Sequence, residues 1–297
     1  MKQSKRGNHV RLSLEDRIFD IVTVAVSVLI VILVLYPMYF VVIASFSDPV
    51  QVQNGNTWLL PKGVSLEAYK MVFEDESIWR GYYNTIIYTA GAAAFSLLVV
   101  MPAAYALSRK DFVLRGPLNF YFLIVMFFSG GLIPTYLQVR NLGLIDTYWV
   151  MVIPFSVNVY HLIVARTFFS SSIPTELREA AEIDGCSNTR FFVQIVLPLS
   201  KAIIAVIGLY VAVSCWNGYF NALIYLNDAA KKPLQNILRG ILLKSEVELG
   251  GGWDEIMRKT EMLKYALIVI SSVPIMAVYP FIQKYFAKGV MIGSLKG

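Results

Sequence analysis

The chain has 297 residues, of which 57% are hydrophobic and only 15% are charged, whereas about 25% of the residues in an ordinary soluble domain are charged. Its mean hydropathy is +0.59, and several windows reach the roughly 20 mainly apolar residues that a membrane-spanning helix needs. The sequence therefore predicts an all-α polytopic membrane protein. The net charge of +6 does not indicate nucleic-acid binding, because the basic residues are spread along tails and loops rather than gathered with aromatic residues on one face.

Six apolar segments are long enough to be transmembrane helices, and they cover residues 18–45, 84–107, 118–139, 148–165, 202–226 and 262–286. The first is longer than the core of a signal peptide and lacks a small-residue cleavage site, so we expect it to be a retained span. This pattern divides the chain into four parts. A tail (1–17) precedes a first span with an outer loop (18–83), and a five-helix core (84–287) with a polar loop at 166–200 is followed by a second tail (288–297).

The distribution of Lys and Arg predicts the orientation of these spans. Basic residues are concentrated in the N-terminal tail, in the connection between the second and third spans and near the C-terminus, whereas the connection between the third and fourth spans offers only Arg140. We therefore expect both termini and the loop 166–200 to face the cytoplasm. The connection between the fifth and sixth spans also carries cations, but acidic residues nearly match them, and we interpret it as an outer loop with structure of its own.

The predicted spans lack the groups that drive transport or catalysis. No Asp, Glu, Lys or Arg lies well inside any of them, whereas ion-driven carriers usually keep such a residue in the membrane. His161 is the one interior candidate, and a packing role is the favoured interpretation of it. The sequence has no phosphate-binding GxxxxGK[ST] element and no catalytic motif in a span, and Cys186 and Cys215 indicate neither a disulfide nor a metal site. We therefore expect a transport protein rather than an enzyme, with no cofactor or metal of its own.

The loop 166–200 predicts a short helix followed by a sharp turn. Pro174 suits the start of a helix, with Ser172 or Thr175 nearby to cap it, and Gly185 suits the left-handed position that ends one. Spacings of three and four place Leu177, Ala180, Ala181 and Asp184 on one face, and Arg178 pairs with Glu182 at i,i+4. A second helix would follow from a Ser187 cap through Phe191, Phe192 and Ile195 and stop before Pro198. An ordinary interfacial helix is the alternative to a docking surface.

The spacing within this loop resembles the EAA motif of ABC importer permeases. That motif is carried by Glu179-Ala180-Ala181, by Gly185 after three intervening residues, and by Ile195 and Leu197-Pro198. Other stretches are similar to the sugar-importer branch of the family: 83–85 (YNT), 102–109 (PAAYALSR), 216–223 (WNGYFNAL) and 289–297 (GVMIGSLKG). The segment 126–135 (MFFSGGLIPT) resembles a narrower group of permeases, which import oligosaccharides released from pectin or alginate. Gly218 departs from the family pattern, since many relatives carry a charged or larger polar residue there.

The resemblance implies the type I ABC importer permease fold and a bacterial inner-membrane location. It also implies a second permease, usually in a heterodimer, two ATPase subunits that bind ATP and Mg, and an extracytoplasmic solute-binding protein that delivers a sugar or oligosaccharide. In such importers the polar loop forms a coupling helix that rests in a cleft of the ATPase. The residues expected to carry this coupling are Glu179, Ala180, Ala181, Asp184 and Gly185.

Sugar recognition requires aromatic faces for the rings and amides or hydroxyls for the sugar hydroxyl groups. Six residues of the predicted spans offer these groups: Ser129, Asn158, Trp216, Asn217, Tyr219 and Asn221. Lipid-facing aromatic residues and bonds between helices are the alternative interpretation, and one helix cannot point Trp216, Asn217 and Tyr219 the same way. For the whole chain, two alternatives stay open: a permease of the same architecture for a non-sugar solute, and a self-sufficient carrier or channel.

Overall fold

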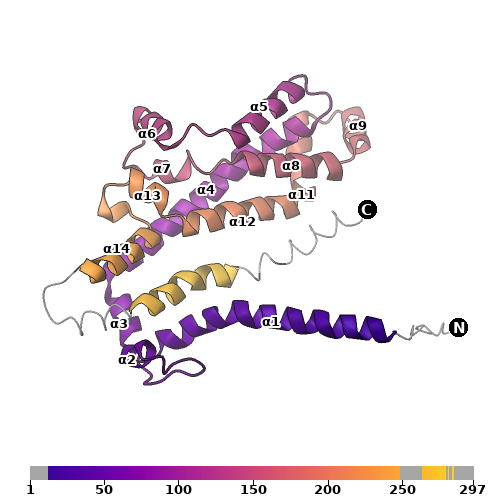
Figure 1. The fold of residues 1–297 in the computed structure, drawn as a ribbon. Coiled ribbons are helices and arrows are strands. Elements are labelled where there is room, and N and C mark those ends of the chain that lie inside the picture. The colour runs from indigo at the N-terminus through magenta and orange to yellow at the C-terminus, as the bar shows by residue number, and fades with distance from the viewer. Residues whose placement is uncertain (1–12, 248–262, 279, 281–282, 284–297) are drawn as a thin grey trace. The chain divides into compact units, whose positions relative to one another are not determined.

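The computed structural model describes residues 13–247, 263–278, 280 and 283 (Figure 1). All regular elements in these residues are helical, as predicted. The longer helices are α1 (Leu14–Ser45), α4 (Glu76–Ser108), α5 (Arg115–Phe127), α6 (Leu132–Asn141), α8 (Val159–Ser172), α12 (Lys201–Asn217), α14 (Leu234–Val247) and a last helix, Leu263–Val278. The shorter ones are α2 (Pro49–Gln53), α3 (Glu67–Glu74), α7 (Trp149–Val152), α9 (Thr175–Ile183), α10 (Asn188–Phe191), the π-helical turn Phe192–Val196, α11 (Leu197–Leu199), α13 (Phe220–Tyr225) and the 3₁₀ turn Ala229–Lys231.

The chain divides into two compact units. The first contains residues 13–70 and 263–269 among those described. Its helix α1 begins with a capping box, in which Ser13 and Asp16 exchange hydrogen bonds between side chain and backbone, so that two donors at the helix start are satisfied. At the other end of α1, the Ser45 hydroxyl lies 2.7 Å from that of Tyr69, and the Tyr69 ring stacks on Phe46. These contacts hold the segment after α1 against its end.

The second unit contains, among the described residues, 71–247, 270–278, 280 and 283. It is organised around α4, which packs against α8, α12 and α14. One core cluster lies toward the C-terminal half of α4 and includes Val100, Ala104, Ala165, Phe169 and Ile207. A second cluster surrounds Tyr88 near the start of α4 and includes Val150, Ala222 and Tyr225. Helix α4 therefore connects the two ends of this unit.

Two helices of the described residues, α1 and α4, are each long and apolar enough to cross a membrane, and the number rises to four if each of two bent helix pairs forms one span. The predicted first and second spans agree with α1 and α4, although α4 begins earlier, at Glu76. The count of six spans stays a prediction. Residues 1–12 of the N-terminal tail, the C-terminal tail, the centre of the connection between the fifth and sixth spans, and most of the sixth span beyond Val278 lie outside the described residues.

The third predicted span is not one straight helix. Helices α5 and α6 are bent by 116° across the break between Phe127 and Leu132. Gly131, in this break, has a φ of +84°, a left-handed conformation that glycine adopts without steric cost. The apolar composition of 118–139 predicted membrane burial but carried no information on this bend.

The fourth and fifth predicted spans are also interrupted. Pro154 follows α7, and a proline lacks the N–H that a continuing helix needs. Between α12 and α13 lies Gly218, where a Cβ atom would be 3.1 Å from the Ser214 carbonyl oxygen, so the backbone turns where only glycine fits comfortably. Helix α8, by contrast, continues to Ser172 and includes Arg166 near its middle. Arg166 therefore lies just beyond the predicted end of the fourth span at 165, but within the helix that continues it.

Candidate functional site

The polar loop forms the predicted short helix, α9. Pro174 precedes it, but no side chain caps its first turn, so the expected capping by Ser172 or Thr175 is wrong; the fixed φ of the proline already directs the chain into the helix. At the other end Gly185 has the predicted left-handed conformation, with a φ of +73°. The Cys186 N–H donates to the Ala181 carbonyl over 2.9 Å, which satisfies a carbonyl at the helix end.

The surface of α9 differs from the face that the spacing suggested. Ala181 is only 8% exposed and packs into the protein's own core, whereas Glu179, Ala180, Asp184 and Gly185 are exposed. The side chain of Ile183 is 87% exposed. Sequence reasoning missed Ile183, yet its position three residues after Ala180 indicates the same helix face. The exposed face of α9 therefore carries one large apolar side chain, Ile183, beside the acidic Glu179 and Asp184.

An ion-pair network attaches α9 to the connection between α4 and α5. Asp111 lies 2.5 Å from Arg109 and 2.7 Å from Arg178, and Arg178 also approaches Glu182 at 3.4 Å, as the i,i+4 spacing predicted. Arg109 donates a further bond of 2.6 Å to the Asn188 side chain. The hydrogen bonds from Arg109, and then those from Arg178, lower the pKa of Asp111 below its ordinary value. Sequence reasoning missed Asp111, because no local pattern indicates a partner so distant in the chain.

The segment after Gly185 runs from α10 to α11 and then turns. The Ser187 hydroxyl accepts a bond of 3.3 Å from the Arg190 N–H, as predicted for a cap. The helical path continues through a π-helical turn and includes Pro198 in α11, so the expected stop before Pro198 is wrong; a proline is tolerated in the first turn of a helix, where its missing N–H costs little. The segment Asn188–Leu199 meets α12 at 79°.

One aromatic cluster joins this loop to the long helices. The Tyr105 ring of α4 contacts Phe169 of α8 at 5.9 Å and Phe192 at 5.2 Å between ring centroids, and Phe191 is buried in the same core. Close-packed side chains transmit a displacement rather than absorb it. A force applied to α9 would therefore move the ends of α4 and α8 with it.

Of the six candidate solute-contacting residues, the structure brings two together. Asn158 and Asn221 line one cavity of about 90 Å³, together with Ser156, His161 and Ser214. The Nδ1 atom of His161 is buried without a hydrogen-bond partner, and its ring stacks on Tyr210 at 5.8 Å. The cavity thus combines two amides, two hydroxyls and an imidazole between α8, α12 and α13.

The other four candidates lie elsewhere. Trp216 is buried, and its indole N–H donates to the Ser271 carbonyl over 3.1 Å. Asn217 bonds back to the Val213 carbonyl of its own helix at 3.0 Å. The guanidinium of Arg239 lies 4.7 Å from the Tyr219 ring centroid, and the Ser129 hydroxyl accepts a bond from the Gly131 N–H at the bend. Each of these four side chains thus contacts a group of the chain itself, and their part in the solute path stays a prediction.

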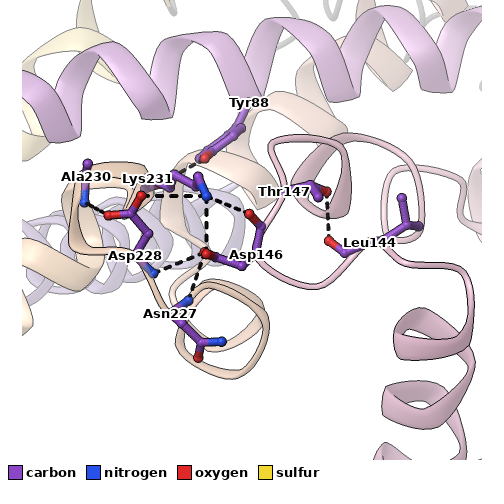
Figure 2. Close-up of polar contacts among 8 residues, drawn as sticks. All are labelled: Tyr88, Leu144, Asp146, Thr147, Asn227, Asp228, Ala230 and Lys231. Atoms are coloured by element: carbon purple, nitrogen blue, oxygen red, sulfur yellow. Dashed lines mark hydrogen bonds and ion pairs between the residues drawn. The ribbon is translucent and has the colours of Figure 1, made fainter.

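A polar cluster that sequence reasoning missed connects two loops near the start of α4 (Figure 2). Asp146 has a φ of +57° and accepts bonds from the Asn227 and Asp228 N–H groups, both at 3.1 Å. Lys231 donates to the Asp146 carbonyl at 2.7 Å and lies 3.2 Å from its carboxylate. The pKa of Asp146 is lowered mainly by the hydrogen bond that its carboxylate accepts from the Asp228 N–H. The pKa of Lys231 is raised mainly by its hydrogen bond to the Asp146 side chain.

Helix α4 holds the same loop through three side chains. The Tyr88 hydroxyl donates to the Lys231 carbonyl at 2.8 Å (Figure 2), Asn84 donates to the Ala230 and Lys232 carbonyls, and Thr85 accepts from the Leu234 N–H at 2.9 Å. Asn84 and Thr85 belong to the segment 83–85 that the sequence had marked as familial. Their role is to satisfy backbone groups of the loop before α14.

Comparison with known proteins identifies relatives of this chain. The sequence profile of the binding-protein-dependent transport system inner membrane component matches residues 78–292. The chain is 39% identical to the polygalacturonan/rhamnogalacturonan transport system permease protein YtcP of Bacillus subtilis (strain 168), with 96% of this chain and 100% of the relative covered. It is equally similar to protein LplC of the same organism, with 95% and 96% covered.

A solved structure has the same fold. The crystal structure of a bacterial ABC transporter involved in the import of the acidic polysaccharide alginate contains a chain that superposes with a TM-score of 0.84 and is 35% identical. The match covers 93% of this chain and 99% of the other.

Proposed function

This chain belongs to the family of binding-protein-dependent transport system inner membrane components, and we propose that it carries oligosaccharides bearing uronic acid groups through the bacterial inner membrane. It is a transport subunit with the type I ABC importer permease fold, not an enzyme. A second, different permease would form a heterodimer with this chain and complete the membrane pathway. Two ATPase subunits would bind the ATP and Mg.

The similarity to YtcP over almost the entire chain is the observation that carries this proposal. YtcP is named for polygalacturonan and rhamnogalacturonan, and the superposed structure is named for the acidic polysaccharide alginate. These polymers have in common sugar rings that carry carboxylates. The proposed substrate class follows from that shared chemistry, rather than from either individual polymer.

We place the contact with the ATPase on α9. Glu179, Ala180 and Ile183 form its exposed face, with Asp184 beside them, and would enter the cleft of the partner. Ala181 would act from within, since its small side chain lets α9 pack closely on the permease core. Gly185 would set the turn after the helix. The ion pairs of Arg178 and the aromatic cluster around Tyr105 would then pass the movement of the ATPase to α4 and α8.

The solute path is proposed to include the cavity lined by Asn158 and Asn221, since amides and hydroxyls suit the hydroxyl groups of a sugar. Arg166 offers a positive charge in the same helix, and its Nε is buried without a hydrogen-bond partner. Ionisable groups inside membrane-spanning helices are costly and are usually kept for function. A uronate carboxylate passing α8 would provide the counter-charge.

The orientation belongs to the same proposal. Both tails and the loop 166–200 would face the cytoplasm, and the binding protein would deliver solute at the opposite mouth. The first span and its loop (18–83) would be an addition to the five-helix core (84–287). One observation supports this division: residues 13–70 and α4 fall in different compact units, although the boundary lies at 70 and the first unit also takes in 263–269.

The test is uptake by the assembled transporter with its ATPase and binding protein in proteoliposomes. Radiolabelled galacturonate oligomers should accumulate only with ATP, and neutral galactose oligomers of the same length should neither accumulate nor compete. Equal uptake of the neutral oligomers would contradict the acidic substrate class. Accumulation driven by this chain alone would contradict the need for an ATPase.

A variant tests the role of Arg166 separately. Arg166→Gln keeps a long polar side chain but removes the charge, so uptake of galacturonate oligomers should fall about tenfold or more, the effect of losing one charge-assisted bond. Arg140→Gln, an exposed arginine of α6, is the matched control and should transport normally. Normal uptake by the Arg166 variant would remove this residue from the path.

A further inference from the structure

A second polar cavity lies where α9 meets the end of α4 and the start of α5. Its volume is about 110 Å³, several times the ~30 Å³ that one water occupies in the liquid. The lining includes Tyr105, Arg109, Lys110, Arg115, Ser170 and Arg178. It is separate from the cavity of Asn158 and Asn221 and from the exposed face of α9. Two of its lining residues, Tyr105 and Arg178, also belong to the proposed coupling path, but that role does not involve a ligand in the cavity.

The charge of this cavity is strongly unbalanced. Four of its lining side chains are basic and none is acidic. Arg109 and Arg178 share Asp111, which contacts both from outside the lining, and Arg178 also approaches Glu182. Lys110 and Arg115 have no ion-pair partner among the residues that the structure describes. The cavity therefore holds more positive charge than its neighbours neutralise.

The hydroxyl of Tyr105 provides an independent indication of a ligand. Tyr105 is only 8% exposed, and its hydroxyl is buried beside the Arg109 guanidinium, which can only donate, so the hydroxyl proton has no acceptor among the described residues. Leaving a buried hydroxyl unpaired costs roughly 1–3 kcal/mol, so such groups in native proteins usually have a partner. Because Tyr105 lines the cavity, a ligand with acceptor oxygens in the cavity would satisfy the hydroxyl.

We propose that this cavity binds a phosphate group. Phosphate offers several acceptor oxygens, matches the fork of an arginine guanidinium and also accepts bonds from lysine and tyrosine. Given the orientation proposed above, the cavity opens at the cytoplasmic ends of the helices, where basic pockets between helices bind the headgroups of anionic lipids. A lipid headgroup and a soluble phosphate are the two sources of this chemistry.

Binding there would affect coupling, because the lining residues belong to three segments that must move together. Arg178 is on α9, Arg115 begins α5, and Tyr105 lies in the last turns of α4. One phosphate held between them would replace repulsion between cations with attraction. The proposal rests on the family and the orientation of the loop, but not on the identity of the transported solute.

The experiment measures ligand binding to the purified assembled transporter in detergent. Native mass spectrometry would count short-chain phosphatidylglycerol molecules that stay bound, with phosphatidylcholine as the neutral reference, and calorimetry would titrate inorganic phosphate. Preferred retention of phosphatidylglycerol without competition by inorganic phosphate identifies the lipid source, and saturable binding of inorganic phosphate identifies the soluble source. Binding of neither probe would overturn the proposal.

Two variants assign the bound probe to the cavity. Lys110→Gln with Arg115→Gln should weaken binding at least tenfold, and Tyr105→Phe, which removes only the hydroxyl, should weaken it severalfold. Arg190→Gln with Lys201→Gln removes two exposed cations outside the cavity and should bind like the parent. Unchanged binding by either cavity variant, when it copurifies with the ATPase, would place the probe elsewhere and overturn the proposal.

Discussion

At the residue scale, the turn after α9 depends on Gly185. Its φ is +73°, and a Cβ atom there would meet nothing within 4 Å, so a substitution is opposed only by the left-handed backbone, at about 1–2 kcal/mol. Gly185→Ala should therefore insert normally but lose most ATP-driven uptake, because the turn sets the position of α9.

Gly143→Ala is the matched control, since Gly143 has a φ of +68° and equally open surroundings but lies in the connection after α6. It should show a similar loss of thermal stability with normal uptake. The coupling role of Gly185 would be refuted by equal uptake in the two variants.

Ile183 allows a second residue-scale prediction. Because the Ile183 side chain is 87% exposed, the substitution Ile183→Glu removes little packing inside the permease. The melting temperature of the variant should therefore differ from that of the parent by less than about 2 °C, as for surface substitutions generally. If α9 enters a cleft of the ATPase, the buried charge should instead abolish copurification of that subunit. Val113→Glu changes a residue that is 90% exposed and should leave copurification intact. Retention of the ATPase by the Ile183 variant would exclude it from the contact.

At the scale of elements, the cluster of Asp146 joins the connection after α6 to the loop before α14. Asp146→Asn keeps the oxygen that accepts the two backbone N–H groups but loses the charge facing Lys231, whereas Asp146→Ala loses both. The melting temperature at pH 7 should thus fall in the order parent, Asn variant, Ala variant.

The pH dependence of this difference has a defined sign. The folded protein lowers the pKa of Asp146, so its carboxylate stabilises the fold above the ordinary carboxyl pKa, and this contribution is lost as the pH falls through the lowered folded value. The gap in melting temperature between the parent and the Asn variant should shrink on acidification below about pH 4. A gap independent of pH would show that the charge contributes nothing.

At the scale of the whole molecule, the proposed orientation can be tested with a native thiol. Cys186 and Cys215 are the two cysteines of the sequence, and Cys186 lies partly exposed in the turn after Gly185. In a Cys215→Ala background, a membrane-impermeant maleimide should label Cys186 in inverted vesicles but not in intact spheroplasts.

An exposed position on the proposed outer side supplies the control. Asn141→Cys, at the end of α6, in a chain without either native cysteine, should be labelled with the opposite preference. Labelling of Cys186 from outside would reverse the orientation and remove α9 from reach of a cytoplasmic ATPase.

Properties that depend on residues close together in the sequence were predictable from the sequence alone. Apolar length indicated α1 and α4, the preference of glycine for positive φ indicated the end of α9, and a serine before a helix indicated the cap of α10. Each of these depends on interactions within one helical turn or on the mean hydropathy of one segment. The spacing of the EAA motif is likewise a property of the linear chain, and it was sufficient to indicate the family.

Tertiary structure alone decided which residues meet. Asp111 pairs with Arg178 and Asp146 with Lys231 across long stretches of chain, and no local pattern specifies such pairs. Residue type made Trp216 a candidate for sugar contact, and only the fold places its indole N–H on the Ser271 carbonyl. Ala181 and Ala180 are neighbours in the motif, yet only the packing of α9 on the core makes one an internal anchor and leaves the other exposed. Hydropathy measures how much of a segment avoids water, whereas long-range packing determines what each side chain contacts.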